Sequence, residues 1–293
     1  MASKSKNIAT TCVHAGPMPD AHGAVMPPIY LSSTYAFETV GKQRTFDYGR
    51  SGNPTRFALE TCLAELEGGI RGFAFGTGMA ATATLIQLFN AGDHFLVHDD
   101  LYGGTYRLMA SVLSTKGVDV EFINMRDLDK LRAAIRPNTR GIWTETPTNP
   151  LMNLLDLAAI AEIAKQHNVI TLCDNTFLSP YFQRPLDLGM DIVMHSTTKY
   201  LNGHSDVVGG GAVTNNPELA DKIGMLQNAM GSGQAPLTAS SCSAVSRRFL
   251  SGWMSTTQTR LHLQSGCKPA RKSRKCFTLG WRAIHSTSWQ SAR

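Results

Sequence analysis

The sequence lacks the features of a membrane-spanning protein and of a disulfide-rich protein. It contains no run of about 18 apolar residues that could cross a bilayer, and its first 16 residues lack the apolar stretch of a secretory signal. No Cys-x-x-Cys pair occurs among its cysteines, which are Cys12, Cys62, Cys173, Cys242, Cys267 and Cys276. We therefore expect a cytoplasmic protein with reduced thiols, without a metal site and without membrane contact.

Acidic residues are missing from the end of the chain. Residues 237–293 hold 10 Lys and Arg and no Asp or Glu, whereas residues 1–236 hold 18 Lys and Arg and all 22 Asp and Glu. The formal net charge is therefore +10 in the last segment and −4 in the rest. Because the last segment also lacks a periodic apolar pattern, we interpret its charge as a solvated surface and expect no nucleic-acid partner.

Residues 1–236 show the alternation of short strands and helices that is typical of an α/β protein with a mostly parallel sheet. With 42% hydrophobic residues, the chain can bury a large core. Helices are predicted at 53–67, 79–89, 104–114, 128–135 and 157–167. Strands are predicted at 94–98, 118–123, 141–145, 169–173 and 191–195.

Polar residues follow four of these strands at their carboxyl ends, where open α/β sheets bind ligands. They are residues 99–104, residues 145–149, Asp174 and Lys199. Taken alone, Lys199 resembles a solvated surface lysine and Asp174 resembles a turn residue. Together they indicate pyridoxal phosphate, which needs a lysine for its aldehyde and a carboxylate for its ring nitrogen.

Two further segments could complete such a site. Backbone N–H groups of Gly76-Thr77-Gly78-Met79, before a predicted helix, could bind the phosphate. Without Lys199 and Asp174, an ordinary glycine-rich turn would be the better explanation of this segment. Tyr102 follows a strand and could stack on a flat ring. Taken alone, it is equally consistent with an exposed tyrosine in a turn.

Five motifs in this order resemble those of the Cys/Met-metabolism pyridoxal phosphate family, from about residue 8 to residue 236. They are YGRSGNPTR at 48–56, DLYGGT at 100–105, ETPTNP at 145–150, DNTFLSP at 174–180 and HSTTKYLNGHSD at 195–206. The resemblance implies the large domain of an aspartate-aminotransferase-like fold of type I. It also implies pyridoxal 5'-phosphate as the cofactor and a homotetramer built from dimers.

The resemblance also implies a role for each matching residue. Lys199 would be the Schiff-base lysine that moves protons, Asp174 would pair with the ring nitrogen, and Tyr102 would stack on the ring as an acid or base. Asn149 would bond the ring hydroxyl. The phosphate would be held by Gly78, Met79, Ser196 and Thr198, and by Tyr48 and Arg50 of a neighbouring subunit.

The implied activity is γ-elimination or γ-replacement on a small sulfur amino acid, as in cystathionine γ-lyase and cystathionine γ-synthase. A cystathionine β-lyase or methionine γ-lyase type of activity, or a catalytically impaired remnant of the family, is the alternative. A nucleic-acid-binding protein would depend on the basic end of the chain alone. We prefer a transsulfuration enzyme because five motifs in order are a more specific indication of function than the basic charge of that segment.

The resemblance ends after Pro236, although relatives continue into a smaller C-terminal domain. A one-base shift of the reading frame near Pro236 would explain this, because codons chosen for 251–260, 277–280 and 280–292 encode family-like strings at one shared offset. We therefore expect an arm at 1–52 that reaches a neighbouring subunit, a cofactor-binding domain at 53–236 and a disordered, frameshifted tail at 237–293. The missing domain holds the arginine that binds the substrate carboxylate in relatives, so that role has no assigned residue here.

Overall fold

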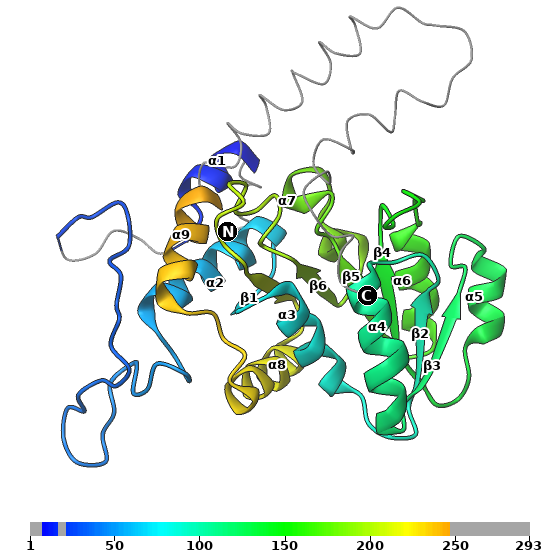
Figure 1. Ribbon diagram of the computed structural model, residues 1–293, viewed down its shortest axis with the longest axis horizontal. Helices are drawn as coiled ribbons and strands as arrows, with labels where there is room; N and C mark the ends of the chain where they lie inside the picture. Colours follow the sequence, from blue (N-terminus) through cyan, green and yellow to red (C-terminus); the bar gives the residue numbers. More distant parts are fainter. Residues whose placement is uncertain (1–7, 17–21, 247–293) are drawn as a thin grey trace, which may run out of the picture. The chain divides into compact units, whose positions relative to one another are not determined.

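A seven-stranded sheet forms the centre of this computed structural model, which describes residues 8–16 and 22–246 (Figure 1). The strands are β1 (Arg71–Phe75), β2 (His94–His98), β3 (Asp119–Ile123), β4 (Thr139–Glu145), β5 (Ile170–Asp174), β6 (Ile192–His195) and β7 (Gly210–Thr214). Their order is β1-β7-β6-β5-β4-β2-β3, and β7 runs antiparallel to the other six strands. The mostly parallel sheet that the sequence predicts is confirmed.

The carboxyl ends of the parallel strands meet at one edge of the sheet. Glu145 at the end of β4 is the register partner of Asp174 at the end of β5. Asp174 in turn pairs with Met194, one residue before the end of β6. The segments that follow these three strands therefore lie side by side, and they carry most of the candidate site residues.

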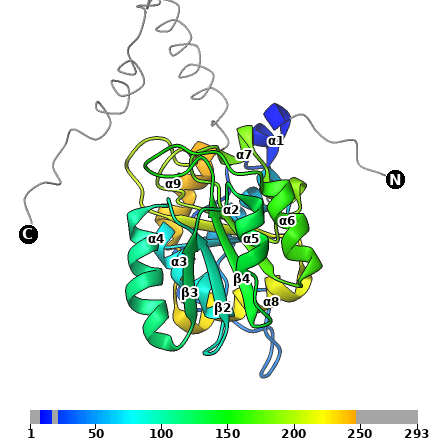
Figure 2. The ribbon, with the colours of Figure 1, turned by 90° about the vertical axis from the view of Figure 1, so that its right-hand side faces the viewer.

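Helices cover both faces of the sheet. They are α1 (Ile8–His14), α2 (Pro54–Glu67), α3 (Gly78–Leu85), α4 (Gly103–Leu108), α5 (Leu128–Ala134), α6 (Leu157–Gln166), α7 (Ser179–Phe182), α8 (Pro217–Met230) and α9 (Pro236–Ser246). The shorter turns are η1 (Ile86–Leu88), the π-helical η2 (Met109–Leu113), η3 (Ser114–Lys116) and η4 (Pro185–Leu188). In Figure 2 the strands β2, β3 and β4 stand between α4 and α6.

Two hydrophobic clusters of the described residues lie against the sheet. One cluster joins Phe73 and Phe95 of the sheet to α3, η2 and α8. The other joins Leu96 and Ile142 to α5 and α6. Side chains of successive strand residues point to opposite faces, which explains why Phe95 and Leu96 belong to different clusters. Both faces are buried, so the strands are nearly continuous hydrophobic runs.

Helix α2 begins and ends where the sequence predicts. Asn53 caps it, since its side chain accepts hydrogen bonds from the backbone N–H groups of Thr55 and Arg56, and Gly68 ends it in the left-handed region at φ 72°. The other predicted helices and strands are also present, with boundaries that differ by a few residues. Strands β1 and β7 and helices α1, α7, α8 and α9 were not predicted.

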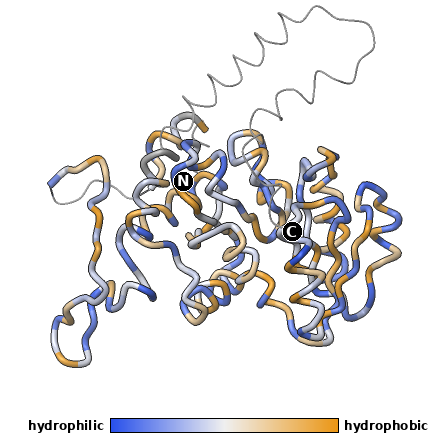
Figure 3. The backbone as a smooth tube through the Cα atoms, in the orientation of Figure 1, coloured by the Kyte–Doolittle hydropathy of each residue, from blue (hydrophilic) through white to orange (hydrophobic). Residues whose placement is uncertain are grey.

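Residues 22–52 form an extended stretch with little regular structure. Their large apolar side chains are mostly exposed, including Val25, Leu31 and Val40, and Figure 3 shows hydrophobic segments among hydrophilic ones along this stretch. Arg56 anchors its end, because the Arg56 guanidinium donates to the carbonyl oxygens of Gly49 and Arg50 at 2.9 Å each. Whether this stretch reaches a neighbouring subunit stays a prediction.

Helix α9 corrects the predicted start of disorder at residue 237. It continues the ordered chain to Ser246, because Ala239 and Cys242, three residues apart, are both fully buried and α9 packs against α2. The remainder of the predicted tail, residues 247–293, lies outside the described residues. Within the described part of the chain, no helix combines the length and hydrophobicity that a membrane span needs.

Candidate active site

Asp174 lies at the end of β5 with 7% of its surface exposed. Its Oδ1 atom accepts hydrogen bonds from the Thr176 backbone N–H at 3.0 Å and from the Thr176 hydroxyl at 2.5 Å. Among the described residues, Oδ2 accepts no hydrogen bond, so it can receive a donor from a ligand. Burial raises the pKa of Asp174, while the Thr176 bonds and the charge of His195 oppose that rise.

Glu145 is the second buried carboxyl at this edge. Its Oε2 atom accepts the backbone N–H of Tyr102 at 2.7 Å. Burial, followed by repulsion from Asp174, raises the pKa of Glu145 to about 9. Glu145 is therefore neutral at pH 7, which leaves Asp174 as the carboxyl of the pair that a cationic ring would ionise.

The raised pKa of Glu145 predicts that stability falls with increasing pH. Between the ordinary pKa of 4.5 and the folded value of about 9, the folded protein binds a proton that the unfolded chain has released. The stabilisation present below the lower value is thus lost as pH rises. In Glu145→Gln, which cannot ionise, the melting temperature of the cofactor-free protein should decline less between about pH 5 and about pH 8, by at least about 2 °C.

Thermal unfolding followed by circular dichroism at several pH values measures this effect. Glu162→Gln, an exposed change on α6, is the control and should follow the wild-type curve. Parallel curves for wild type and Glu145→Gln would contradict a neutral Glu145.

Lys199 lies in the turn that follows β6, and its side chain is exposed. The turn is closed by the Lys199 N–H, which donates to the Ser196 carbonyl oxygen at 3.2 Å. Ser196 N–H donates to the Thr176 hydroxyl at 2.8 Å, and that hydroxyl donates to Asp174. Thr176 therefore joins the Asp174 strand end to the turn that carries Lys199.

The fold brings together residues that the sequence predicts to bind the phosphate. Thr77 caps α3, and its hydroxyl accepts the Ala80 N–H at 2.8 Å. The N–H groups of Gly78 and Met79, in the first turn of α3, have no acceptor within the helix. A Cβ atom at Gly78 would lie 2.9 Å from the Ser196 Cβ atom. The free end of α3 and Ser196 thus form a narrow cradle that suits an anion.

Gly78→Ala should weaken binding of pyridoxal phosphate by about tenfold, the loss expected for one hydrogen bond to a charged group. The added methyl would lie 3.0 Å from the Ser196 hydroxyl oxygen and displace it from the cradle. Titration of the full chain with the cofactor, followed by visible absorbance, measures the loss. Gly103→Ala is the control, because nothing lies within 4 Å of the added atom, and equal binding by both variants would contradict the cradle.

Tyr102 and Thr198 occupy the other predicted positions around the site. Tyr102 precedes α4 with 48% of its surface exposed, and its ring would be 2.5 Å from a Cβ atom at Gly104. The same Cβ would be 3.0 Å from the Met79 sulfur, so the ring lies near the start of α3. The Thr198 hydroxyl donates to the Gly209 carbonyl oxygen at 3.2 Å and would have to turn to bind a phosphate.

Asn149 is half-buried in the loop after β4. Its neighbour Thr148 donates its hydroxyl to the Asp100 carboxylate, and Asn153 donates to the same oxygen at 3.2 Å. These bonds join the loop after β2, which holds Tyr102, to the loop that holds Asn149. The sequence motif contains Asn149, but only the structure shows that Asp100 and Thr148 hold its loop.

Tyr48 and Arg50 lie apart from the strand ends, in the extended N-terminal stretch. The Arg50 guanidinium lies over the Tyr48 ring, 5.4 Å from its centroid, and donates to the Asn228 carbonyl oxygen of α8 at 2.7 Å. The structure of one chain thus connects the pair to α8. Their predicted place in a neighbouring subunit's phosphate site stays a prediction.

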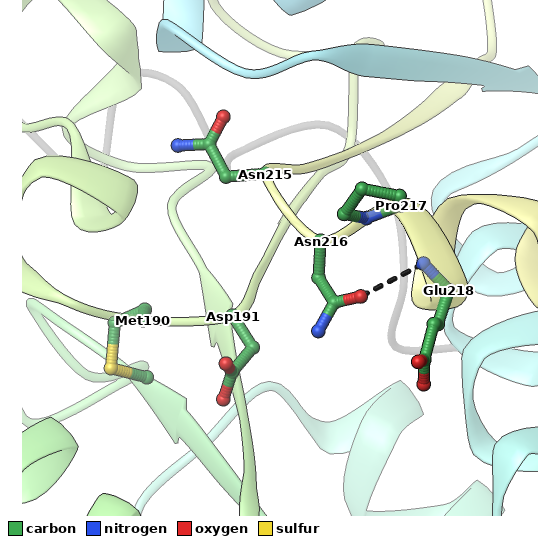
Figure 4. A pocket seen from close by; sticks show the side chains of 6 residues that line it. All are labelled: Met190, Asp191, Asn215, Asn216, Pro217 and Glu218. Atoms are coloured by element: carbon green, nitrogen blue, oxygen red, sulfur yellow. Dashed lines mark hydrogen bonds between the residues drawn. The ribbon is translucent and has the colours of Figure 1, made fainter.

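A separate hollow lies at the opposite, amino-terminal edge of the parallel strands (Figure 4). It is lined by Met190, Asp191, Asn215, Asn216, Pro217 and Glu218. Asp191 binds the backbone and hydroxyl of Thr171, and Asn216 caps α8 through the Glu218 N–H. Because these polar groups already serve the fold, the hollow does not compete with the Asp174 edge as a functional site.

Comparison with known proteins identifies relatives over the described region. Residues 9–244 match the family model described as Cys/Met metabolism PLP-dependent enzyme. A probable cystathionine gamma-synthase of Herpetosiphon aurantiacus is 52% identical over 230 residues, which are 78% of this chain and 72% of that protein. A cystathionine beta-lyase of Coxiella burnetii is also 52% identical, over 80% of this chain and 61% of its own length.

A solved structure is similar as well. The cystathionine gamma-lyase of Lactobacillus plantarum, complexed with L-serine, superposes with a TM-score of 0.81 at 48% identity, covering 83% of this chain and 64% of that one. This chain therefore spans less than two thirds of that structure and of the Coxiella protein. The match to the family model at 237–244 also places the first residues after Pro236 inside the family region.

Proposed function

Because this chain belongs to the Cys/Met metabolism PLP-dependent enzyme family, we propose that it binds pyridoxal 5'-phosphate and that the complete site acts on sulfur amino acids by γ-elimination or γ-replacement. The observation that carries this proposal is the junction of three segments at one sheet edge. Thr176 links Asp174 to Ser196, and Ser196 meets Gly78 at the free start of α3.

Several residues at this edge have the chemistry that the cofactor would need. The open Oδ2 atom of Asp174 would accept the ring N–H, and its buried carboxyl, whose pKa is raised, would be stabilised as an anion by the cationic ring. Gly78, Met79 and Ser196 would hold the phosphate, and Thr198 would join them once its hydroxyl turned. Tyr102 would stack on the ring and Asn149 would bond the ring hydroxyl.

When bound, the cofactor withdraws electrons from the substrate and makes its Cα–H bond acidic. Lys199 would remove the Cα proton with Nζ and return a proton at another carbon of the same substrate. Its exposed position in a hydroxyl-rich turn gives Nζ the freedom to reach several carbon atoms. Tyr102 would supply a second acid or base on the ring face. Proton removal at Cβ is the step that permits loss of a group from Cγ.

A second candidate activity is β-elimination, as in the Coxiella relative named cystathionine beta-lyase. A γ-synthase relative and this β-lyase share the same 52% identity with the chain. The two reactions use the same lysine and the same Asp174. They differ in where the leaving group stands on the substrate, so products from cystathionine distinguish them.

We further propose that the protein acts in the cytoplasm as a homotetramer built from dimers. No described residue is assigned to bind the substrate carboxylate. Because the family match continues to residue 244, a reading-frame shift would have to lie beyond that residue rather than at Pro236. Resequencing the gene tests the shift: an unambiguous template whose other frame encodes nothing similar to the family would contradict it.

The proposed function is tested by cofactor titration and by product analysis. We expect the purified full chain to gain visible absorbance with pyridoxal phosphate, and to release keto acid and ammonia from cystathionine. Absence of cofactor binding would contradict the proposal.

A further inference from the structure

We propose that Glu67 is a positioning residue for the cofactor, and that its carboxylate clamps together the strand ends that carry Asp174 and Lys199. This inference rests on the proposed function, since it concerns the same site. Glu67 is the last residue of α2 and is fully buried. It lies 132 positions before Lys199 in the chain and belongs to none of the motifs that the sequence analysis uses.

One oxygen of Glu67 receives two hydrogen bonds. The His195 Nε2 atom lies 2.5 Å from Glu67 Oε1, and the Asn175 side-chain amide donates to the same oxygen at 3.0 Å. His195 is 1% exposed and Asn175 is fully buried. Asn175 is held further by Gln183, whose amide donates to the Asn175 Oδ1 atom at 3.0 Å. Glu67, His195 and Asn175 are thus fixed inside the protein.

The two partners of Glu67 lie close in sequence to Asp174 and Lys199, the residues that carry the proposed chemistry. Asn175 directly follows Asp174 at the end of β5, and His195 ends β6, four residues before Lys199. Glu67 Oε1 therefore joins the Asp174 strand end to the Lys199 strand end. The Thr176 hydroxyl is a second link between the same two segments. Two cross-links together fix the separation of Asp174 from the turn of Lys199.

Stability alone does not explain a polar group at this place. Removing a carboxylate from water is costly, and a buried ion pair commonly stabilises a fold no more than apolar side chains of similar size. The same helix already packs through buried Leu59, Leu63 and Leu66. The carboxylate instead fixes the orientation of its two partners, because a hydrogen bond restrains the angle and the spacing between donor and acceptor. Here those partners adjoin Asp174 and the lysine turn.

Cofactor affinity of the full chain tests the clamp. Glu67→Met keeps a similar side-chain size but removes both hydrogen bonds, and we expect pyridoxal phosphate to bind about 10- to 100-fold more weakly. Glu67→Gln retains an acceptor oxygen for both partners, and we expect it to bind within about threefold of wild type. His195→Leu removes the bond from the β6 side and should weaken binding as Glu67→Met does, which gives a second variant if Glu67→Met fails to fold.

A double-mutant cycle separates positioning from a structural role. If Glu67 acts through Asp174, Glu67→Met should change cofactor affinity by less than about threefold when Asp174 is already Ala. His94→Leu is the matched control. His94 is a fully buried histidine whose Nδ1 atom lies 2.8 Å from the Thr139 hydroxyl. Both residues lie at the amino ends of their strands, β2 and β4, at the sheet edge opposite the candidate site. His94→Leu should lower the melting temperature without changing cofactor affinity.

The outcomes are distinct. Failure of the wild-type chain to bind pyridoxal phosphate would contradict the proposed function itself. Binding by wild type, with unchanged affinity in folded Glu67→Met or His195→Leu, would overturn the clamp alone. The clamp is also overturned if both variants lose only melting temperature, or if Glu67→Met weakens binding by the same factor in the Asp174→Ala background.

Discussion

Lys199→Ala is expected to abolish the visible absorbance of bound pyridoxal phosphate and to reduce proton removal from an amino-acid substrate by about 10²- to 10⁴-fold. The methyl group cannot bond the cofactor aldehyde and cannot carry a proton. The backbone of the turn should persist, because Lys199 contributes to it through its own N–H and carbonyl oxygen. Absorbance titration, together with exchange of the substrate Cα proton in heavy water, measures both losses.

Lys165→Ala is the control for this change, since Lys165 is an exposed lysine in the last turn of α6. It should leave absorbance and proton exchange unchanged. If Lys199→Ala kept both the absorbance and the exchange rate of the wild-type chain, another amine would be the reactive one. The assignment of Lys199 would then be wrong even though the fold and the family membership stand.

Asp174→Asn should lower the rate of Cα proton exchange by at least about 100-fold, while cofactor affinity falls by less than about tenfold. The amide keeps the size of the carboxyl and can still accept the Thr176 bonds. It cannot keep the ring nitrogen protonated, because it carries no negative charge. The loss therefore concerns the electron-withdrawing power of the cofactor more than its attachment.

Asp129→Asn serves as the control, because Asp129 is a strongly exposed aspartate on α5. It should change neither quantity. Equal losses of affinity and of exchange rate in Asp174→Asn would contradict an electronic role for the carboxyl. Such a result would indicate that Asp174 mainly maintains the shape of the site.

The sequence predicts the parts of the fold whose local signals agree with their tertiary environment. Asn53-Pro54 at the start and Gly68 at the end define α2 because capping depends on neighbouring residues alone. Strand β2 has an apolar centre, Phe95-Leu96-Val97, because it is buried on both faces. Since parallel strands share one carboxyl edge, the predicted strands already place Asp174 and Lys199 near each other.

The unpredicted strands have weak local signals. Strand β7 has the sequence Gly-Gly-Ala-Val-Thr, and its glycines are required by tertiary contacts. A Cβ atom at Gly210 would lie 2.3 Å from the Thr77 carbonyl oxygen, so only glycine allows the segment before α3 to approach the sheet. Helix α8 has a readable start, because Asn216-Pro217 forms a cap that the sequence analysis overlooked.

The polar groups behind the site could not be predicted from local patterns. Thr176 lies beside Asp174 in a motif, but its bond to the Ser196 N–H joins residues 20 positions apart. The contact between Glu67 and His195 spans 128 positions. Neither distance is set by a helical or strand period, so only the packed structure shows which side chains hold the motif residues in place.

Reduction of the cofactor-loaded full chain with borohydride, followed by peptide mass spectrometry, tests the central claim most directly. Reduction makes the bond between the cofactor and its amine permanent, so the modified residue can be identified. We expect the pyridoxyl group on the peptide that contains Lys199 and its absence from that peptide in Lys199→Ala. A label distributed over surface lysines, or no label after loading, would contradict a pyridoxal phosphate site at this edge of the sheet.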